Sequence, residues 1–228
     1  MTGSGPQVAL IHASATSIEP AKQAFASHFP IARLWHLLDD RLVADADVAG
    51  GLTPPLRKRM STLIDYAVAG GADAVQLSCS MYGPVATAAA QPVAVLASDQ
   101  AMFDRVVALR AARVAVIGSL SSAVRDSVER LQDAIEASQP APAITTLVPV
   151  VVEGAAAAAA AGDLFLLNEL MAIRAKQIAS HADAIVLAQY SLAPAYPALQ
   201  AALDIPVLSP PHLAAAALKE LLGEEVGA

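Results

Sequence analysis

The residue with the clearest capacity for chemistry is Cys79, the only cysteine among the 228 residues. It follows residues 74–78, a short apolar run that we interpret as a buried strand, and precedes residues 80–84, which should turn into a helix. In open parallel sheets, ligands bind beyond the carboxyl ends of the strands. Backbone N–H groups at such a turn can bind a carboxylate, and a helix amino terminus favours the thiolate. The alternative is a buried cysteine that only packs.

A second segment repeats the sequence around Cys79. Residues 71–84, GADAVQLSCSMYGP, align with residues 181–194, HADAIVLAQYSLAP, at a constant offset of 110 that places Gln189 opposite Cys79. Two further pairs match in the same order, residues 8–11 with 114–117 and residues 92–93 with 206–207. Three matched segments in one order predict two similar halves.

Short apolar runs alternate along the chain with segments of helical periodicity. The runs read as strands are residues 8–12, 33–37, 74–78, 92–96, 113–117, 184–188 and 206–208. Helix starts are predicted at Ser17, at Thr53 before Pro54, at Ser98, at Ser121 or Ser122, and at Asp163, with a last helix to about Leu222. The alanine run 155–161 is read as part of a helix or a connector, without chemistry.

Apolar strands that alternate with helices are typical of a parallel sheet covered on both faces. We therefore expect an α/β protein with two similar doubly wound parallel-sheet domains, related by a pseudo-twofold internal repeat. The first domain is expected to comprise residues 1–97 and a returning segment, 206–228. The second is expected to comprise residues 98–205.

Composition narrows the classes of function. A net charge of −7 with 14 Lys and Arg argues against nucleic acid and membrane surfaces as partners. The mean hydropathy of +0.52 suggests a membrane span, but prolines interrupt the uncharged stretch 184–203. One cysteine and histidines without ligand spacing exclude an intramolecular disulfide and argue against a metal site. No signal peptide is recognisable, so a cytoplasmic location is expected.

The segments around Cys79, Ser119 and Gln189 resemble motifs of the aspartate/glutamate/hydantoin racemase superfamily. Residues 71–80 are similar to its first cysteine motif, residues 114–122 (VAVIGSLSS) to the strand and hydroxyl loop that open its second half, and residues 182–191 to its second cysteine motif. The resemblance covers about residues 8–218. It implies two pseudo-symmetric α/β domains with the active-site cleft between them, no cofactor, and a small carboxylic or amino acid as substrate.

The resemblance also implies a mechanism. In this family, one cysteine from each half moves a proton on opposite faces of the carbon beside a carboxylate. Backbone amides and hydroxyl groups bind the carboxylate and stabilise the enolate-like intermediate. Such a reaction needs a positioned base and donors aimed at the developing oxyanion.

The chain departs from this pattern at Gln189, which stands where the family has its second cysteine. A carboxamide donates and accepts hydrogen bonds but is no proton-transfer base near neutral pH, so a symmetric two-thiol racemase is excluded. The leading hypothesis is cofactor-independent racemase-like or isomerase-like chemistry through Cys79 alone. One alternative is a decarboxylase with one-sided protonation by Cys79, a logic similar to that of arylmalonate decarboxylase. The other is a member that binds a small carboxylate without turnover.

The remaining candidates are polar groups near the ends of the matched strands. Tyr190 is a candidate catalytic acid, because an ordinary pKa of about 10 allows it to donate a proton but makes it a poor base; packing is the equal alternative. The candidate substrate-binding residues are Ser14, Ser80, Met81, Ser119, Ser122, Gln189 and Ser191. The serines Ser14, Ser80, Ser119 and Ser122 could equally be helix caps or turn residues. His12 is read as structural or as a secondary donor, and a homo-oligomer is left open.

Overall fold

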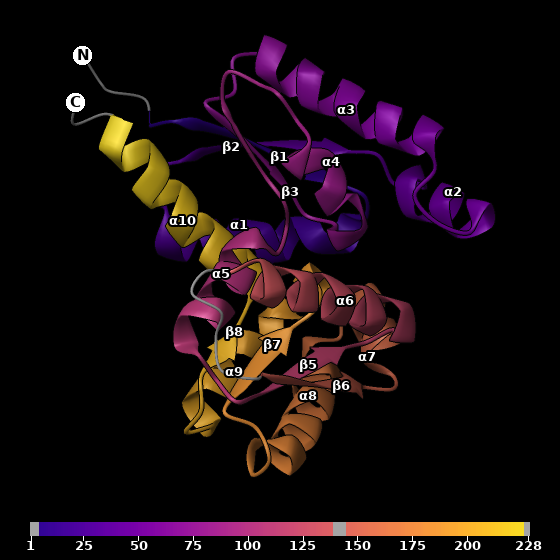
Figure 1. Cartoon of the computed structure of the whole chain (residues 1–228), viewed down its shortest axis with the longest axis vertical. Coiled ribbons are helices and arrows are strands. Elements are labelled where there is room, and N and C mark those ends of the chain that lie inside the picture. Colours follow the sequence, from indigo (N-terminus) through magenta and orange to yellow (C-terminus); the bar gives the residue numbers. More distant parts are fainter. Residues whose placement is uncertain (1–4, 139–144, 226–228) are drawn as a thin grey trace. The chain divides into compact units, whose positions relative to one another are not determined.

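The computed structural model describes residues 5–138 and 145–225, and in this part of the chain the strands form two four-stranded parallel sheets (Figure 1). The chain divides into two compact units. The first comprises Met1–Ser98 and Ala214–Ala228, and the second comprises Asp99–Leu213. Each unit holds one sheet, as two similar α/β domains require.

The sheet of the first unit has the order β2-β1-β3-β4. Its strands are β1 (Gln7–His12), β2 (Arg33–Leu38), β3 (Ala74–Leu77) and β4 (Ala94–Leu96). The helical segments are η1 (Ala15–Ser17), α1 (Ile18–His28), α2 (Arg41–Ala49), α3 (Pro54–Ala69), η2 (Ser80–Tyr82), α4 (Gly83–Thr87) and the later part of α10 (Pro210–Glu225). Figure 1 shows α3 and α1 on opposite sides of the sheet.

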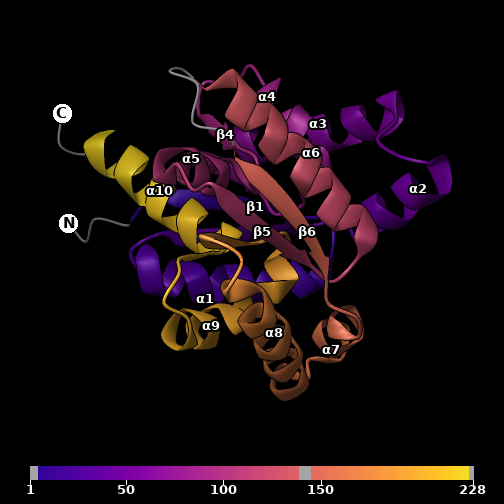
Figure 2. The same ribbon diagram turned by 60° about the horizontal axis from the view of Figure 1, so that its bottom comes forward.

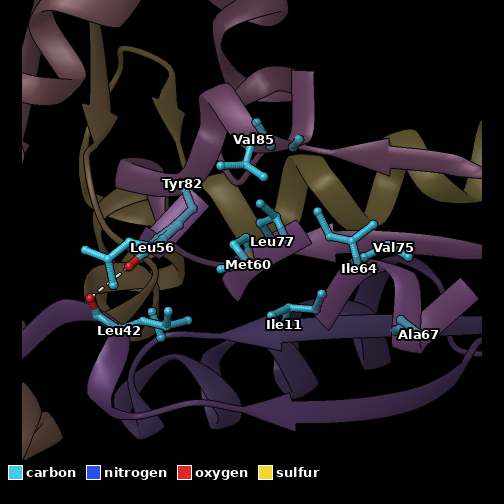
Figure 3. Close-up of a cluster of buried hydrophobic side chains, with 14 of the residues drawn as sticks. Ile11, Leu42, Leu56, Met60, Ile64, Ala67, Val75, Leu77, Tyr82 and Val85 are labelled. Carbon is cyan, nitrogen blue, oxygen red and sulfur yellow. Dashed lines mark hydrogen bonds between the residues drawn. The ribbon is translucent and has the colours of Figure 1, made fainter. Parts of the chain in front are cut away.

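One face of this sheet carries the main core of the first unit. Ile11 of β1 and Leu77 of β3 pack against Met60 and Ile64 of α3, and all four are buried (Figure 3). Burial of each such aliphatic side chain contributes about 1.5–3 kcal/mol. The core therefore fixes β1 and β3 side by side, and with them the loops that leave their carboxyl ends.

The second sheet has the order β6-β5-β7-β8. Its strands are β5 (Arg113–Gly118), β6 (Thr146–Val151), β7 (Ala184–Leu187) and β8 (Val207–Leu208). The helical segments are α5 (Gln100–Leu109), α6 (Ser121–Ala137), α7 (Ala155–Ala161), α8 (Leu164–Ala179), η3 (Tyr190–Ala195) and α9 (Tyr196–Ala202). Separate apolar clusters cover its two faces, one with α7, α8 and α9 and the other with α5 and α6, and Figure 2 shows α6 and α8 on opposite sides of β5 and β6.

The repeated Ala-Asp-Ala has a structural reason. The carboxylate of Asp73 accepts a hydrogen bond from the N–H of Gln7 at 2.6 Å, and that of Asp183 accepts one from the N–H of Arg113 at 2.8 Å. Each aspartate also donates its own backbone N–H to the carbonyl of the same partner. In both units the aspartate thus joins the amino ends of the two central strands, which accounts for its presence in both copies.

Two sequence-based predictions need correction. β8 pairs with β7, so the predicted boundary at 206 is wrong: this strand belongs to the second sheet, and the chain returns to the first unit at Ala214. The helix predicted from Ser98 begins at Gln100, with Asp99 as its N-cap residue. The helix start predicted at Thr53 is confirmed, because Thr53 holds the N-cap position of α3, although its side chain makes no capping hydrogen bond.

Other predicted helix starts agree with the structure. The carboxylate of Asp163 accepts a hydrogen bond from the N–H of Leu166 at 3.0 Å and so caps α8. Helix α6 begins at Ser121, and the alanine run 155–161 forms α7. Helix α2 and strand β6 have no counterpart among the predicted elements.

Candidate functional site

In the first unit, the candidate residues meet at the carboxyl edge of the sheet. Strands β1 and β3 are parallel neighbours in which Ile11 pairs with Leu77, so the residues after both strands emerge together. This edge therefore carries Ser14 from the loop after β1, and Cys79, Ser80 and Met81 from the loop after β3.

Cys79 occupies the N-cap position of η2 with an extended backbone, φ −121° and ψ 121°. Its side chain is partly buried and packs against the apolar core of the first unit, as does that of Met81. Ser80, also partly buried, opens the helical turn. Ser14 caps η1: its Oγ accepts a hydrogen bond from the N–H of Thr16 at 3.4 Å and lies 2.9 Å from the Thr16 hydroxyl.

Tyr82 was not among the candidates, yet it fixes the segment that carries Cys79. Its ring is buried, and its hydroxyl donates to the carbonyl of Leu42 in α2 at 2.9 Å (Figure 3). Burial, followed by the charge of Cys79, raises the pKa of Tyr82 to about 12. Tyr82 is therefore a neutral anchor three residues after the thiol.

Replacement of Tyr82 by phenylalanine is expected to lower the free energy of unfolding by about 1–2 kcal/mol. The change keeps the ring but leaves the carbonyl of Leu42 without its donor. Chemical denaturation monitored by circular dichroism measures the change. Tyr66→Phe is the matched control, because Tyr66 is 60% exposed. Equal stability of both variants would show that the bond to Leu42 contributes nothing measurable.

His12 joins β1 and β3 through a buried polar network. Its Nδ1 lies 2.7 Å from the hydroxyl of Ser17 and 3.1 Å from that of Ser78, and these two hydroxyls are 3.0 Å apart. The Ser17 hydroxyl donates its proton to the carbonyl of Ser14 at 2.8 Å, so it can only accept from His12. We therefore place the ring proton of His12 on Nδ1. Its Nε2 then accepts from Nδ1 of His36 at 3.0 Å. Ser17, predicted as a helix cap, uses its side chain in this network instead.

The network makes His12 a positioning residue. Burial, followed by the charge of His36, lowers the pKa of His12 to about 4, so its ring is neutral near pH 7. A ring held by Ser17 and Ser78 anchors the residue that directly precedes Cys79. This geometry supports the structural reading of His12.

The lowered pKa of His12 predicts that acid destabilises the protein. In the unfolded chain His12 binds a proton below about pH 6.5, whereas in the folded chain it does so only below about pH 4. Stability from this residue is thus complete above pH 6.5 and is lost as pH falls to 4, by about 3 kcal/mol in total. NMR titration of the His12 ring and denaturation at several pH values measure both quantities. A ring that titrates near pH 6.5 in the folded protein would contradict the prediction.

In the second unit, Gln189 folds back onto its own sheet. Its Oε1 accepts two hydrogen bonds from Ser119, from the backbone N–H at 2.8 Å and from the hydroxyl at 2.9 Å. Gly118 leaves room for this contact, because a Cβ at that position would meet Oε1 at 3.3 Å and a methyl group of Val124 at 2.5 Å. The carboxamide is therefore held in one orientation.

The other candidates of the second unit follow β5 and β7 at the carboxyl edge of its sheet. Ser119 is buried, and Ser122 is exposed on the first turn of α6. Tyr190 opens η3 with a buried ring, 3% exposed, and Ser191 is partly buried beside it. Cys79 and Gln189 thus hold equivalent positions in the two units, since each is the extended N-cap residue of the 3₁₀ segment after the second central strand.

Metal-ligand clusters and membrane-spanning helices are both missing from the residues that the structure describes. Among the residues that the structure describes, no three His, Cys, Asp or Glu side chains cluster as metal ligands would. Within 5–138 and 145–225, no helix combines the length and the apolar character needed to cross a bilayer.

Comparison with solved structures confirms the fold. An aspartate racemase from Picrophilus torridus superposes with a TM-score of 0.73 at 14% identity, over 96% of this chain and 95% of that one. An allantoin racemase from Klebsiella pneumoniae gives 0.70 at 16% identity, over 97% and 89%, and a glutamate racemase from Francisella tularensis gives 0.66 at 12% identity, over 98% and 82%.

Sequence comparison adds nothing to this result: no protein-family model and no curated protein sequence matches the chain. The chain thus has the two-domain fold of the aspartate, glutamate and allantoin racemases, as the motif resemblance implied.

Proposed function

We propose that the protein is a cofactor-independent enzyme with racemase-like chemistry on a small carboxylic or amino acid, and that Cys79 is its only proton-transfer thiol. The observation that carries the proposal is the place of Cys79, at the carboxyl edge of the first sheet in a chain with the racemase fold. Ligands of open parallel sheets bind at this edge. The core packing and the Tyr82 anchor hold the thiol segment there.

The thiolate of Cys79 takes the proton from the carbon beside the carboxylate, and the electron pair of the C–H bond moves into an enolate. The same thiol then returns a proton to that carbon. The equivalent position of the second unit holds Gln189, a carboxamide that cannot act as a second base. Proton exchange is therefore expected on one face of the substrate.

The test is deuterium incorporation at the α-carbon of enantiopure acids in D₂O, followed by ¹H NMR. Because Cys79 is the only cysteine, iodoacetamide modifies a single site and provides the matched inactive sample. Exchange with retained configuration that stops after alkylation supports the proposal. Exchange that survives complete alkylation contradicts it, and so does alkylation that needs prior denaturation, because a packed thiol meets no substrate.

A further inference from the structure

Strand β2 is the outer strand of the first sheet and pairs on one side only, with β1 (Figure 1). The backbone groups of successive strand residues point in opposite directions, so every second residue bonds to the neighbouring strand. The N–H of Arg33 donates to the carbonyl of Pro6, which directly precedes β1. The odd-numbered residues of β2 therefore bond to β1. The residues whose N–H and C=O groups point outward are Leu34, His36 and Leu38.

The outward edge of β2 is available to another strand. In the part of the chain that the structure describes, no hydrogen bond reaches the backbone N–H or C=O groups of Leu34, His36 or Leu38. All six residues of β2 keep some exposure, and Leu38 is 45% exposed. Unpaired backbone groups in a row are a surface on which a further strand can add.

The other three outer strands of the two described sheets are poorly suited to such pairing. Strand β4 has three residues and β8 has two, which is too short for an extended ladder. Strand β6 has six residues but contains Pro149, which has no N–H to donate. Strand β2 has six residues without Pro, Gly or Lys, the residues that commonly prevent edge pairing. It is therefore the outer strand on which a ladder can form over the full length.

We propose that β2 is a dimer interface: it pairs with β2 of a second copy of this chain, antiparallel about a twofold axis at His36, and joins the two first-unit sheets into one. The inference is independent of the proposed function, because it concerns only the outer edge of the sheet. It commits to a second copy because the sequence of β2 is complementary to itself in this arrangement.

The side chains match about this axis. Each residue meets the one that lies equally far from His36 on the other copy, so Leu34 meets Leu38 and His36 meets its own copy. These outward-facing pairs each exchange two backbone hydrogen bonds. On the opposite face of the strand, Trp35 meets Leu37. Apolar side chains thus meet apolar side chains on both faces of the joined sheet.

The position of the axis follows from the outward residues. An axis at Leu37 would set Leu34 against residue 40, beyond the end of β2, and an axis at Trp35 would set Leu38 against residue 32, before its start. Only the axis at His36 pairs all three outward residues. Burial, followed by the charge of Lys22, lowers the pKa of His36, so the two rings at the axis are neutral near pH 7.

The charges at the two ends of the strand also match. Arg33 and Asp39 lie equally far from His36, so Arg33 of each copy faces Asp39 of the other. Asp39 continues the ladder beyond β2, because its N–H donates to the carbonyl of His12 at 3.0 Å. A second copy therefore brings opposite charges together twice.

Sedimentation equilibrium of the full chain at increasing concentration tests the inference, and a monomer–dimer equilibrium is expected. Leu38→Lys is expected to raise the dimer dissociation constant about tenfold or more, because it removes an apolar pair twice and adds charge to the edge. Leu164→Lys is the matched control, since Leu164 is 46% exposed on α8, and it should change nothing. Thermal unfolding verifies that both variants fold.

A charge reversal tests the register. Arg33→Glu sets two acids against each other at both ends of the pair, so the dissociation constant is expected to rise about threefold, and more at low salt. The effect is smaller than that of Leu38→Lys because Asp39 already pairs with Arg59 at 2.5 Å. Arg105→Glu, an equal change of charge at an exposed residue of α5, is the matched control.

Amide hydrogen exchange followed by NMR identifies the surface. The amides of Leu34, His36 and Leu38 should become protected as concentration rises, whereas those of Trp35 and Leu37 should be protected at every concentration because they bond to β1. A monomer at all concentrations overturns the proposal and leaves the edge to an extended peptide of another protein. A dimer that Leu38→Lys does not weaken, or one without new protection at these three amides, overturns it too, because the copies then meet elsewhere.

Discussion

Replacement of Cys79 by alanine is expected to lower the rate of α-proton exchange by about 10²–10⁴-fold, the range that a positioned proton-transfer group contributes. The loss should appear in kcat, because the thiol acts on the C–H bond rather than on the groups that bind the acid. Binding of the same acid by calorimetry should change little. The thiol is partly buried at the end of β3 and packs on the core, so removing one sulfur leaves the strand ends in place.

Cys79→Ser is the matched control. It keeps a hydroxyl of similar size at the same extended N-cap position, but that hydroxyl is not ionised near neutral pH. Both variants should therefore lose exchange while they retain the thermal unfolding of the parent. If Cys79→Ala exchanged at the parent rate, the thiol would be a packing residue and another group would have to move the proton.

The parts of the fold that the sequence predicted are those encoded in local pattern. Apolar runs gave the central strands, and the repeated Ala-Asp-Ala revealed two units because Asp73 and Asp183 each join the amino ends of central strands. Strand β6 escaped prediction because Pro149 interrupts it, a residue that an edge strand tolerates and a central one does not. Helix α2 has only nine residues and buries only Leu42 and Ala46, so its apolar pattern is too short to mark a helix in the sequence.

The places of Cys79 and Gln189 after their strands were predictable from the sequence, but the contacts of the candidate residues were not. The end of β3 and the repeat placed Cys79 and Gln189 from the sequence alone. The hydrogen-bond partners of His12 are separated from it by 5, 24 and 66 residues in the sequence, and Ser119 is separated from Gln189 by 70. No helix or strand periodicity predicts contacts at these separations. Ser17 illustrates the limit, since its type suits a helix cap and only the folded sheet shows its hydroxyl bound to His12 and Ser78. The sequence around Tyr82 shows only an aromatic residue in a predicted turn, so its hydrogen bond to Leu42 could not be predicted.

Conversion of Gln189 to cysteine is expected to create racemisation of an acid that the parent protein deuterates on one face only. The backbone at Gln189, φ −142° and ψ 143°, is extended like that at Cys79, and both residues open a 3₁₀ segment after the second central strand. A cysteine at 189 therefore stands in the second unit as Cys79 stands in the first. Cysteine also lacks the carboxamide oxygen, so the backbone N–H and the hydroxyl of Ser119 lose the acceptor that they have in the parent protein.

Chiral chromatography of the acid and ¹H NMR in D₂O measure the new activity. Gln189→Ser is the matched control. It also removes the carboxamide oxygen that Ser119 binds, but its hydroxyl cannot move protons near neutral pH. It should show one-sided exchange without racemisation. A folded Gln189→Cys variant in which two thiols react with iodoacetamide, yet no racemisation occurs, would reject the equivalence of the two positions.

Racemisation by the parent protein itself would reject the one-thiol mechanism instead. A second acid would then be required, and Tyr190, the buried residue next to Gln189, is the first to test. Tyr190→Phe should abolish such activity if its hydroxyl donates the proton, and should leave one-sided exchange by Cys79 intact. The fold and the place of Cys79 at the edge of the first sheet hold under either outcome, so these substitutions test the mechanism and not the fold.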